Sequence, residues 1–477
     1  MSELKEKTIS GVKWNAIGRF STQGISFLIG LLLARILTPS DYGVVGMVGI
    51  FFAIAQTFID SGFGSALIRK KDCCEADYNT AFYFNIIVGL FSCIILSLLA
   101  PLIADFFETP ILKEIVVVMS FNILINSFSI VQWAKLSSAI DFKSQAKVGV
   151  TTTVVSGIVG LTLAYTGFGV WSLVYQNLFA TILRTILLFF VTKWKPQWIF
   201  SWESFKYLFG FGNKVLTASL LHTIYSNLTT IIIGKFYTAK DLGFYSRGES
   251  LASLPSTNIT SILGSVTYPI LSKIQDDDTR LIQVYRKYIA ITSMVIFFCM
   301  FLLAVLAKPL IITLLTDKWL ESVIYLQIFC FALMFDHICQ LNLNILYVKG
   351  RSDLVLRLEV IKKTISISMI IAAIPFGVLA ICIARAIYTQ IAIVINTYYT
   401  GKLFGLGYMQ QVKDFFKYFV YSICAVIPSY VLTLLNLNPI LIMVLGSSLA
   451  ILFYYLLIRK NPNFLELIQL AKLSVFK

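Results

Sequence analysis

Charged residues are scarce in this sequence. Only 13% of its 477 residues are Asp, Glu, Lys or Arg, whereas 58% are hydrophobic. Soluble globular proteins carry roughly 25% charged residues. The mean hydropathy of the chain is +0.82. A chain of this composition has too few polar side chains to cover its surface in water but can cover it in lipid, so the composition excludes a soluble fold.

Histidine is also rare, and cysteine motifs that bind metals are missing. The chain has two histidines, its eight cysteines show no metal-ligand spacing, and it contains no glycine-rich phosphate loop. All cysteines except Cys73 and Cys74 lie in apolar runs, where a free thiol packs as a small hydrophobic group. We therefore expect no metal catalysis, no ATP hydrolysis and no bound cofactor.

Long hydrophobic runs are what the sequence has instead. Because an α-helix needs about 20 apolar residues to cross the hydrocarbon core, the runs predict an all-α polytopic membrane protein with about 14 transmembrane helices. The expected spans are 13–34, 44–67, 80–104, 115–137, 148–166, 170–191, 207–233, 244–271, 286–312, 320–348, 355–375, 378–400, 414–435 and 439–458.

The basic residues are distributed unevenly between alternate loops. With the N-terminus placed inside, the inside segments hold 29 Lys and Arg and the outside segments hold seven. Cytoplasmic loops of membrane proteins are enriched in these residues, so both termini are expected in the cytoplasm. The net charge of +15 is mostly this asymmetry, and no nucleic-acid partner is needed to explain it.

One motif occurs twice, 200 residues apart: LARILTPSDYGVVG at 33–46 matches IGKFYTAKDLGFYS at 233–246. The aligned pairs are Thr38 with Thr238, Asp41 with Asp241, and Gly43 with Gly243. Each aspartate lies at the start of a predicted helix, where a carboxylate accepts hydrogen bonds from free backbone N–H groups. We therefore predict that both aspartates cap helices.

The repeat extends through six helices. TGFGVWSLV at 166–174 matches IPFGVLAIC at 374–382, at an offset of 208. Because six is even, both copies enter the membrane from the same side, which predicts parallel repeats around a central site. The predicted organisation is an N-lobe at 1–200, a C-lobe at 205–405, and two further helices with a cytoplasmic tail at 406–477.

Polar side chains on one face of several helices predict a hydrated cavity between the lobes. In the first span Arg19 and Ser26 recur at helical spacing, and the span at 115–137 offers Asn122 and Asn126. An arginine at the bilayer centre costs about 2.5–3.5 kcal/mol even on the lenient scale, and its planar fork suits phosphate. The residues predicted to bind substrate are Arg19, Gln23, Ser26, His222, Thr223, Arg247, Thr257 and Arg385.

Some polar residues have a second interpretation. Arg247 lies near a helix end, where it can snorkel or pair with Glu249 or Asp241. Arg184 lies toward the inner end of its span and is interpreted as an interfacial anchor. His222 is equally compatible with a hydrogen-bonded packing role.

Two acidic residues lie inside predicted spans. Asp60 and Asp336 either carry a coupling cation or partner an arginine, and the sequence does not rank these alternatives. Na⁺, H⁺ or the membrane potential are the candidate driving forces.

Four segments carry a family resemblance: ARILTPSDYGVVGM, SGFGSALIRKK, LGFYSRGESLASLP and VTYPILSKIQDD. They resemble the polysaccharide transporter (PST) family of flippases, in the multidrug/oligosaccharidyl-lipid/polysaccharide (MOP) exporter superfamily. The resemblance runs from residue 5 to 405 and more weakly to the end. It is strongest to the Wzx-type branch of lipopolysaccharide and colanic-acid exporters.

The resemblance implies a V-shaped, two-lobed fold with no enzymatic activity. The implied substrate is an undecaprenyl-diphosphate-linked oligosaccharide repeat unit of an O-antigen, capsule or exopolysaccharide. It would be moved across the bacterial cytoplasmic (inner) membrane, with Arg19 among the cationic residues that receive the diphosphate. Membrane lipids, a polysaccharide polymerase and glycosyltransferases are the implied partners.

Three rival functions share part of this evidence. A MATE-like drug or metabolite antiporter, or a lipid II-type flippase, would have the same lobed architecture. The antiporter favours acidic groups for cationic substrates, whereas the buried charge here is mainly basic. A polyprenyl-linked polymerase, ligase or glycosyltransferase normally needs a large catalytic outer loop, and every predicted outer loop here is short.

The charge asymmetry generates a topology prediction. Loops 105–114, 235–243 and 308–319 should face outside, and loops 69–78, 193–206, 273–286 and 349–354 should face the cytoplasm. Single cysteines in a cysteine-free variant, probed in intact cells with a membrane-impermeant thiol reagent, measure this directly. Labelling at position 200 or 276 before permeabilisation would contradict the fourteen-helix topology.

Overall fold

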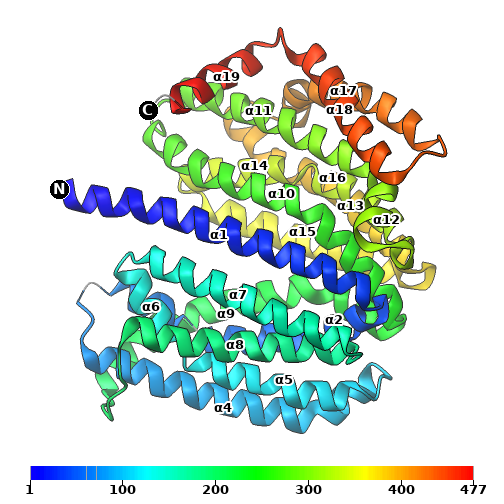
Figure 1. Cartoon of the computed structure of the whole chain (residues 1–477). Helices are drawn as coiled ribbons and strands as arrows, with labels where there is room; N and C mark the ends of the chain where they lie inside the picture. Colours follow the sequence, from blue (N-terminus) through cyan, green and yellow to red (C-terminus); the bar gives the residue numbers. More distant parts are fainter. Residues whose placement is uncertain (1, 61, 71, 476–477) are drawn as a thin grey trace. The chain divides into compact units, whose positions relative to one another are not determined.

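Inside a membrane there is no water to hydrogen-bond the backbone of an apolar run. Each run must therefore satisfy its own N–H and C=O groups by forming a helix. The computed structural model describes residues 2–60, 62–70 and 72–475, without the side chains of 2–9, 12, 214, 261–266 and 470–475. Within these residues it contains helices and no strands (Figure 1). The all-α fold class predicted from the sequence is confirmed.

The helices follow one another with short connections. The first nine are α1 (Ser2–Ile36), α2 (Pro39–Asp60), α3 (Phe63–Arg69), α4 (Glu75–Phe106), α5 (Leu112–Ser127), α6 (Ile130–Ser138), α7 (Phe142–Tyr165), α8 (Val170–Thr192) and α9 (Trp202–Phe236). The others are α10 (Ala239–Lys273), α11 (Asp278–Val305), α12 (Ala307–Leu315), α13 (Ser322–Leu333), α14 (Asp336–Val348), α15 (Ser352–Ala373), α16 (Val378–Phe404), α17 (Tyr408–Thr433), α18 (Pro439–Ile458) and α19 (Pro462–Val475).

Twelve helical segments of the described chain are long and apolar enough to cross a membrane, counting α2–α3, α5–α6 and α13–α14 as one segment each. The expected spans 244–271 and 355–375 form helices α10 and α15 but are not among the twelve. Both carry several charged residues, which lowers their hydropathy. The multi-pass architecture is confirmed, and the count of fourteen spans stays a prediction.

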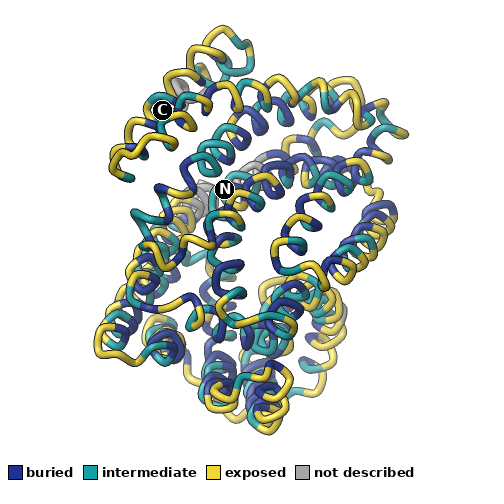
Figure 2. The backbone as a smooth tube through the Cα atoms, turned by 90° about the vertical axis from the view of Figure 1, so that its right-hand side faces the viewer, coloured by how far each residue is buried: buried dark blue, intermediate teal, exposed yellow. Residues whose placement is uncertain are grey.

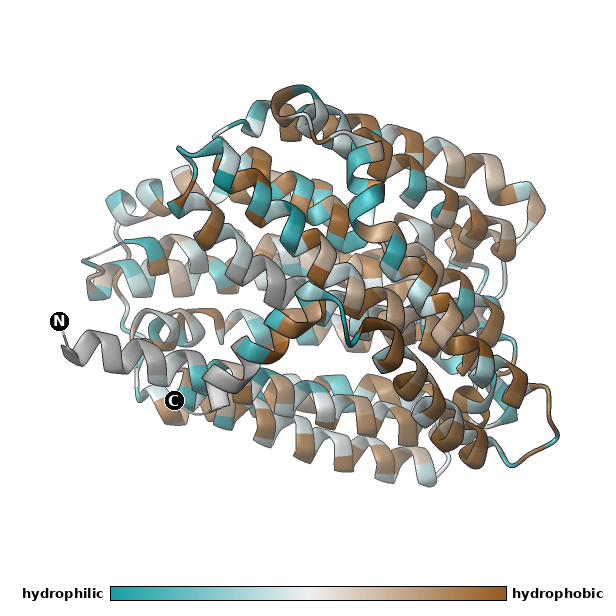
Figure 3. Cartoon of the chain, turned by 90° about the horizontal axis from the view of Figure 1, so that it is seen from above, coloured by the Kyte–Doolittle hydropathy of each residue, from teal (hydrophilic) through white to brown (hydrophobic). Residues whose placement is uncertain are grey.

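Apolar and polar side chains are distributed as expected for a lipid-facing protein. Large apolar side chains are exposed on the helices, with Leu98 73% exposed and Phe190 74% exposed. Amides are fully buried, among them Asn85, Asn342 and Gln411. Figure 2 shows exposed and buried residues alternating along most helices, and Figure 3 shows hydrophobic residues along their length, interrupted by short hydrophilic patches. The helices therefore present hydrocarbon to the membrane and bury polar groups against one another.

The chain packs as two compact units, Met1–Gly243 and Phe244–Lys477. Helix α9, which opens the second sequence repeat, belongs to the first unit because it packs against α2, α3 and α4. The hydroxyls of Thr57 on α2 and Thr223 on α9 lie 3.1 Å apart. The boundary between the packing units therefore lies after α9, whereas the sequence repeat begins before it.

The internal repeat recurs in the backbone. Glu108 and Thr316, 208 residues apart, have positive φ angles of 54° and 79°, where residues other than glycine are uncommon. Gly169 and Gly377, at the same offset, have φ angles of 53° and 96° and precede α8 and α16. Turns at matching positions thus share positive φ angles.

The fourth helix of each repeat is broken at a corresponding point. In the first unit α5 ends at Ser127 and α6 begins at Ile130; in the second, α13 ends at Leu333 and α14 begins at Asp336. A break inside an apolar span frees backbone groups that must find partners in the protein interior or in a wet cavity. Interrupted segments at matching positions of two repeats indicate where a transporter binds its substrate.

The two copies of the repeated turn form the same capping box. In the first copy the Asp41 carboxylate accepts from Thr38 N at 2.8 Å and from Thr38 Oγ1 at 2.7 Å, and Thr38 Oγ1 accepts from Asp41 N at 3.3 Å. In the second copy the corresponding distances between Thr238 and Asp241 are 3.1, 2.6 and 3.2 Å. The predicted capping role of both aspartates is confirmed, with threonine as the N-cap residue.

The two turns also touch each other through the glycines of the motif. A Cβ atom added to Gly43 would lie 1.7 Å from the carbonyl oxygen of Ala239, and one added to Gly243 would lie 1.9 Å from that of Pro39. The contact is reciprocal: each copy supplies the glycine for one contact and the carbonyl for the other. Only glycine permits backbones to approach this closely.

Gly43→Ala tests this contact. Alanine favours a helix over glycine by about 0.8–1.0 kcal/mol, but here the new methyl group would push two backbones apart. We expect a lower melting temperature for the purified variant than for the wild type. Gly49→Ala is the matched control, because Gly49 lies on the same helix with no atom near its added Cβ. Equal melting temperatures for the two variants would contradict the close contact.

Candidate functional site

The break between α5 and α6 exposes an asparagine to the interior of the first unit. Ser129 Oγ donates to the backbone oxygen of Asn126 at 2.8 Å and to its side-chain oxygen at 3.0 Å. Thr185 of α8 donates to the Ile125 carbonyl at 3.4 Å. These hydroxyls satisfy oxygens near the end of α5 and fix the side chain of Asn126.

Two adjoining cavities lie within this unit, of about 610 Å³ and 910 Å³. The smaller cavity lies among α1, α6, α7 and α8, and the larger among α2, α3, α5, α6 and α8. Their volumes fall within the range of about 300–1,000 Å³ that is typical of small-molecule sites. The residues common to both linings are Trp133, Asn177, Thr181 and Arg184.

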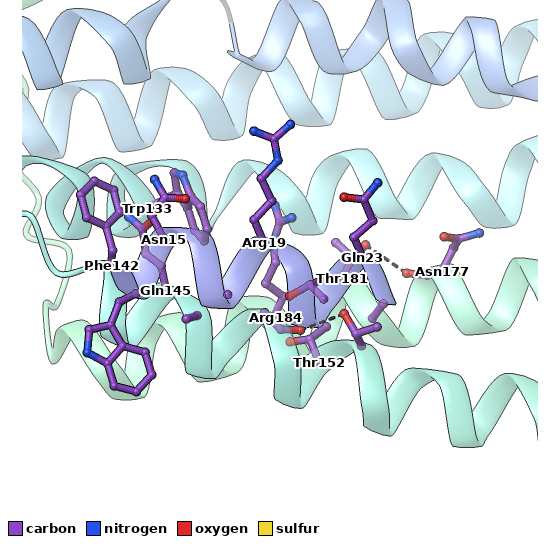
Figure 4. A pocket seen from close by; sticks show the side chains of 17 residues that line it. Asn15, Arg19, Gln23, Trp133, Phe142, Gln145, Thr152, Asn177, Thr181 and Arg184 are labelled. Carbon is purple, nitrogen blue, oxygen red and sulfur yellow. Dashed lines mark hydrogen bonds between the residues drawn. The ribbon is translucent and has the colours of Figure 1, made fainter. Parts of the chain in front are cut away.

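Close packing of α1 on α7 places Arg19 in the smaller cavity. A Cβ on Gly18 would lie 2.6 Å from the Cβ of Ala146, so the two helices meet through small residues. Arg19 and Gln23 then lie in the cavity lining. In Figure 4 Arg19 and Arg184 lie near the middle of the lining, between Trp133 and Phe142 on one side and Gln23 and Asn177 on the other. Two helices distant in sequence thus direct guanidinium groups to one cavity.

A chain of hydrogen bonds orients Arg184. Its Nη2 donates to Asn126 Oδ1 at 2.6 Å, and Asn126 Nδ2 donates to Gln56 Oε1 at 2.8 Å. Gln56 Nε2 donates in turn to Asp60 Oδ1 at 2.8 Å. The chain runs from a cation through two amides to an anion, and it fixes which oxygen and which nitrogen each amide presents. Arg184 is thereby held in place, and among the described residues one of its five N–H groups donates a hydrogen bond.

The arginines inside the helices differ in their counter-ions. Arg19 and Arg184 form no ion pair with a described carboxylate. Arg385 of α16, in the second unit, pairs with Glu249, donates to Tyr245 Oη at 2.9 Å, and lies 5.1 Å from the ring centroid of Phe329. An arginine that already has a carboxylate is less available to a second anion, whereas one without a counter-ion attracts one.

Arg247 lies in a different environment. Its guanidinium carbon is 5.2 Å from the ring centroid of Trp319, a cation–π arrangement. Of the two carboxylates considered as its partners from the sequence, Glu249 pairs with Arg385 and Asp241 accepts a hydrogen bond from Thr238.

The other predicted site residues lie outside the linings of the two cavities. His222 of α9 is exposed, Ser26 of α1 is exposed, and Thr223 is half-buried against Thr57. In the second unit, Thr257 is exposed and donates to the Ser253 carbonyl at 2.6 Å. The structure therefore brings Arg19, Gln23 and Asp60 to these cavities, and it does not bring these four there.

Asp336 begins α14 at the break in the second unit and is half-buried. It corresponds in position to the break at which Asn126 lies in the first unit. No group of three or more His, Cys, Asp or Glu side chains comes together in the part of the chain that the structure describes. A cation site among the described residues would therefore combine at most two such side chains with neutral oxygens.

Arg184 is the cavity residue that the sequence interpretation placed elsewhere. Its position toward the inner end of a span predicts an interfacial anchor, whereas its side chain lines both cavities and bonds to Asn126. A signal was present: Asn177, Thr181 and Arg184 recur at helical spacing on α8, as Asn15, Arg19 and Thr22 do on α1.

The fold resembles solved membrane transporters. The lipid II flippase MurJ, in an inward-closed conformation, has a TM-score of 0.75 at 16% sequence identity, covering 93% of this chain and 98% of that one. An inward-facing multidrug resistance MATE family transporter of the MOP superfamily has a TM-score of 0.60 at 13% identity, covering 82% and 95%. The chain therefore has the MOP-superfamily transporter fold.

The family follows from the sequence comparison. The family model for polysaccharide biosynthesis proteins matches residues 32–324, and the chain belongs to that family. It is similar to the lipopolysaccharide biosynthesis protein WzxC of Escherichia coli (strain K12), at 24% identity over 437 residues, or 90% of this chain and 88% of WzxC. Family and fold together make the protein a membrane transporter of polysaccharide biosynthesis rather than an enzyme, as the resemblance predicted.

Water access to the cavities can be measured at Thr181. In a variant lacking the native cysteines, Thr181→Cys should react with a small, water-soluble thiol reagent, because the position lines both cavities. Leu188→Cys, on the same helix but fully buried, should react far more slowly. Mass spectrometry of the intact protein gives both rates. Equal rates would show that Thr181 does not face a hydrated space.

Proposed function

We propose that the protein is a flippase that moves an undecaprenyl-diphosphate-linked oligosaccharide repeat unit across the cytoplasmic membrane by alternating access. One observation carries the proposal: the smaller cavity of the first unit is lined by two arginines, Arg19 and Arg184, and by no acidic residue. Two guanidinium groups that make no direct ion pair with a described carboxylate form a site for a doubly charged anion.

The chemistry of such a lipid explains why it needs a protein to cross. Its polyprenyl tail is soluble in hydrocarbon, but its diphosphate and its sugars are not, because burying unpaired charged and hydroxyl groups is costly. When a diphosphate binds between Arg19 and Arg184, its hydrogen bonds to water are replaced by hydrogen bonds from the guanidinium N–H groups. Two arginines also keep binding weak enough for release, since each charge-assisted hydrogen bond contributes about 1.5–3 kcal/mol.

The charge of the cavity favours this substrate over that of a multidrug antiporter. A cationic drug would meet two guanidinium groups in the smaller cavity and would be repelled. A lipid II-type substrate shares the diphosphate and would bind the same arginines, so the headgroup decides between these two flippase functions. The relative WzxC is a lipopolysaccharide biosynthesis protein, which supports a polysaccharide precursor as the substrate here.

Transport direction and energy follow from the same charges. An inside-negative potential favours outward movement of an anion by about 2.3 kcal/mol per charge per 100 mV. A coupled cation would bind a carboxylate, and we propose Asp60 and Asp336 as the two candidates, one in each unit. In this proposal both termini are cytoplasmic, glycosyltransferases supply the substrate on the inner face, and a polymerase receives it on the outer face.

Arg19→Gln and Arg184→Gln test the proposal directly. With the purified protein in lipid nanodiscs, each should weaken binding of undecaprenyl diphosphate by about tenfold or more, since 1.4 kcal/mol corresponds to a factor of ten. Arg→Lys at either position should recover only part of the loss, because an ammonium cannot make the paired contact. Native mass spectrometry or microscale thermophoresis measures the affinities.

The matched control is Arg357→Gln, which removes one positive charge at an exposed position of α15. It should leave the affinity unchanged. If Arg19→Gln and Arg184→Gln bind the lipid as tightly as Arg357→Gln does, the diphosphate is not held in this cavity and the proposal fails.

A further inference from the structure

The larger cavity differs in charge from the smaller one. Its charged lining residues are Asp60 and Arg184, so its net charge is zero, whereas the smaller cavity has two positive charges and no negative one. An anion that approaches the larger cavity meets the Asp60 carboxylate as well as the guanidinium. Electrostatics therefore directs a diphosphate to the smaller cavity and leaves the larger one for a neutral group.

The polar groups of the larger cavity are mostly amides and hydroxyls. Gln56, Asn122, Asn126, Asn177 and Thr181 all contribute to its lining. Amides and hydroxyls each donate and accept hydrogen bonds, as sugar hydroxyls do. The side-chain oxygen of Asn122 has no hydrogen-bond partner among the described residues, although it is buried. A buried oxygen of this kind needs a partner, from water or from a ligand.

One aromatic side chain lies in the wall common to both cavities. Trp133 comes from the short helix α6, which packs against α3, α4, α7 and α8, yet its side chain is 41% exposed. Its indole N–H makes no hydrogen bond to another described residue. A partly exposed indole beside amide groups presents an apolar face to the C–H groups of a sugar ring and leaves its N–H free for a hydroxyl.

We propose that the larger cavity is a saccharide subsite and that Trp133 is the platform on which the first sugar stacks. The inference rests on the proposed function, since it places the diphosphate in the smaller cavity. The first sugar is bonded to that diphosphate, so it must lie directly beside it, and the wall formed by Trp133, Asn177, Thr181 and Arg184 is where the two cavities adjoin. Asn122 and Asp60 offer acceptors to its hydroxyls.

The competing role for Trp133 is that of an aromatic anchor in the membrane interface. An anchor would stabilise the protein in the bilayer but would not tell a glycosylated lipid from a bare one. The discriminating measurement is therefore a difference between two ligands for one variant, which a general loss of stability does not produce.

The experiment compares three lipids in nanodiscs: undecaprenyl diphosphate, and the same lipid carrying one glucose or one N-acetylglucosamine. Trp133→Leu should weaken binding of at least one glycosylated lipid about tenfold more than it weakens binding of undecaprenyl diphosphate. Trp133→Phe, which keeps a ring, should recover part of the loss. Trp171→Leu is the matched control, because Trp171 lies on α8 outside both cavities and stacks on Tyr175.

The outcomes separate the two hypotheses. If the wild type binds none of the three lipids, the proposed function fails. If it binds them but Trp133→Leu weakens all three equally, or weakens none, the saccharide subsite is overturned while the diphosphate site stands. Asn122→Ala gives a second test should Trp133→Leu fail to fold: it should weaken a glycosylated lipid and spare undecaprenyl diphosphate, and an equal effect on both overturns the subsite.

Discussion

The cost of an uncompensated guanidinium within a membrane-spanning fold governs how this protein is arranged. Arg385 offsets that cost through an ion pair with Glu249 and a hydrogen bond to Tyr245, both within the second unit. Arg19 and Arg184 form no direct ion pair with a described carboxylate; Arg19 is exposed, Arg184 bonds to Asn126, and both line the smaller cavity, where water could solvate them. Around these two residues the fold provides small residues for close helix packing, a broken helix and a chain of amides. Each feature either opens the cavity or fixes a guanidinium within it.

The two repeats share a backbone but differ in the polar groups at their helix breaks. In the first unit the break presents Asn126, which bonds to Gln56 and Arg184 in an open cavity. In the second the break is followed by Asp336, and the neighbouring His337 is buried and bonded to Ser293 at 2.9 Å. The two repeats thus share the helix break but place different side chains there: the neutral amide of Asn126 in the first unit and the ionisable carboxyl of Asp336 in the second.

The sequence was sufficient for the fold class and for part of the site. Runs of apolar residues predict helices whatever their packing, and the polar stripe through Arg19 and Gln23 predicts a wet face within α1. The break at Phe128–Ser129 was not predicted, because the segment contains neither proline nor glycine. Arg184 was placed elsewhere because its depth depends on how α8 packs. The pairing of Arg385 with Glu249 joins residues 136 positions apart, and no local spacing reveals it.

The reciprocal contact of the two repeated turns has the form of an interface in a symmetric homodimer. Gly43 packs against the carbonyl of Ala239, and Gly243 packs against that of Pro39. The turn of one repeat thus contacts the equivalent turn of the other. Isologous contacts of this kind are normally made by two identical subunits related by a twofold axis. A six-helix ancestor carrying a single TxxDxG turn would already have possessed both halves of the contact. Fusion of two such genes would then have preserved an existing dimer within one chain, and neither glycine could change afterwards without displacing the backbone of the other copy.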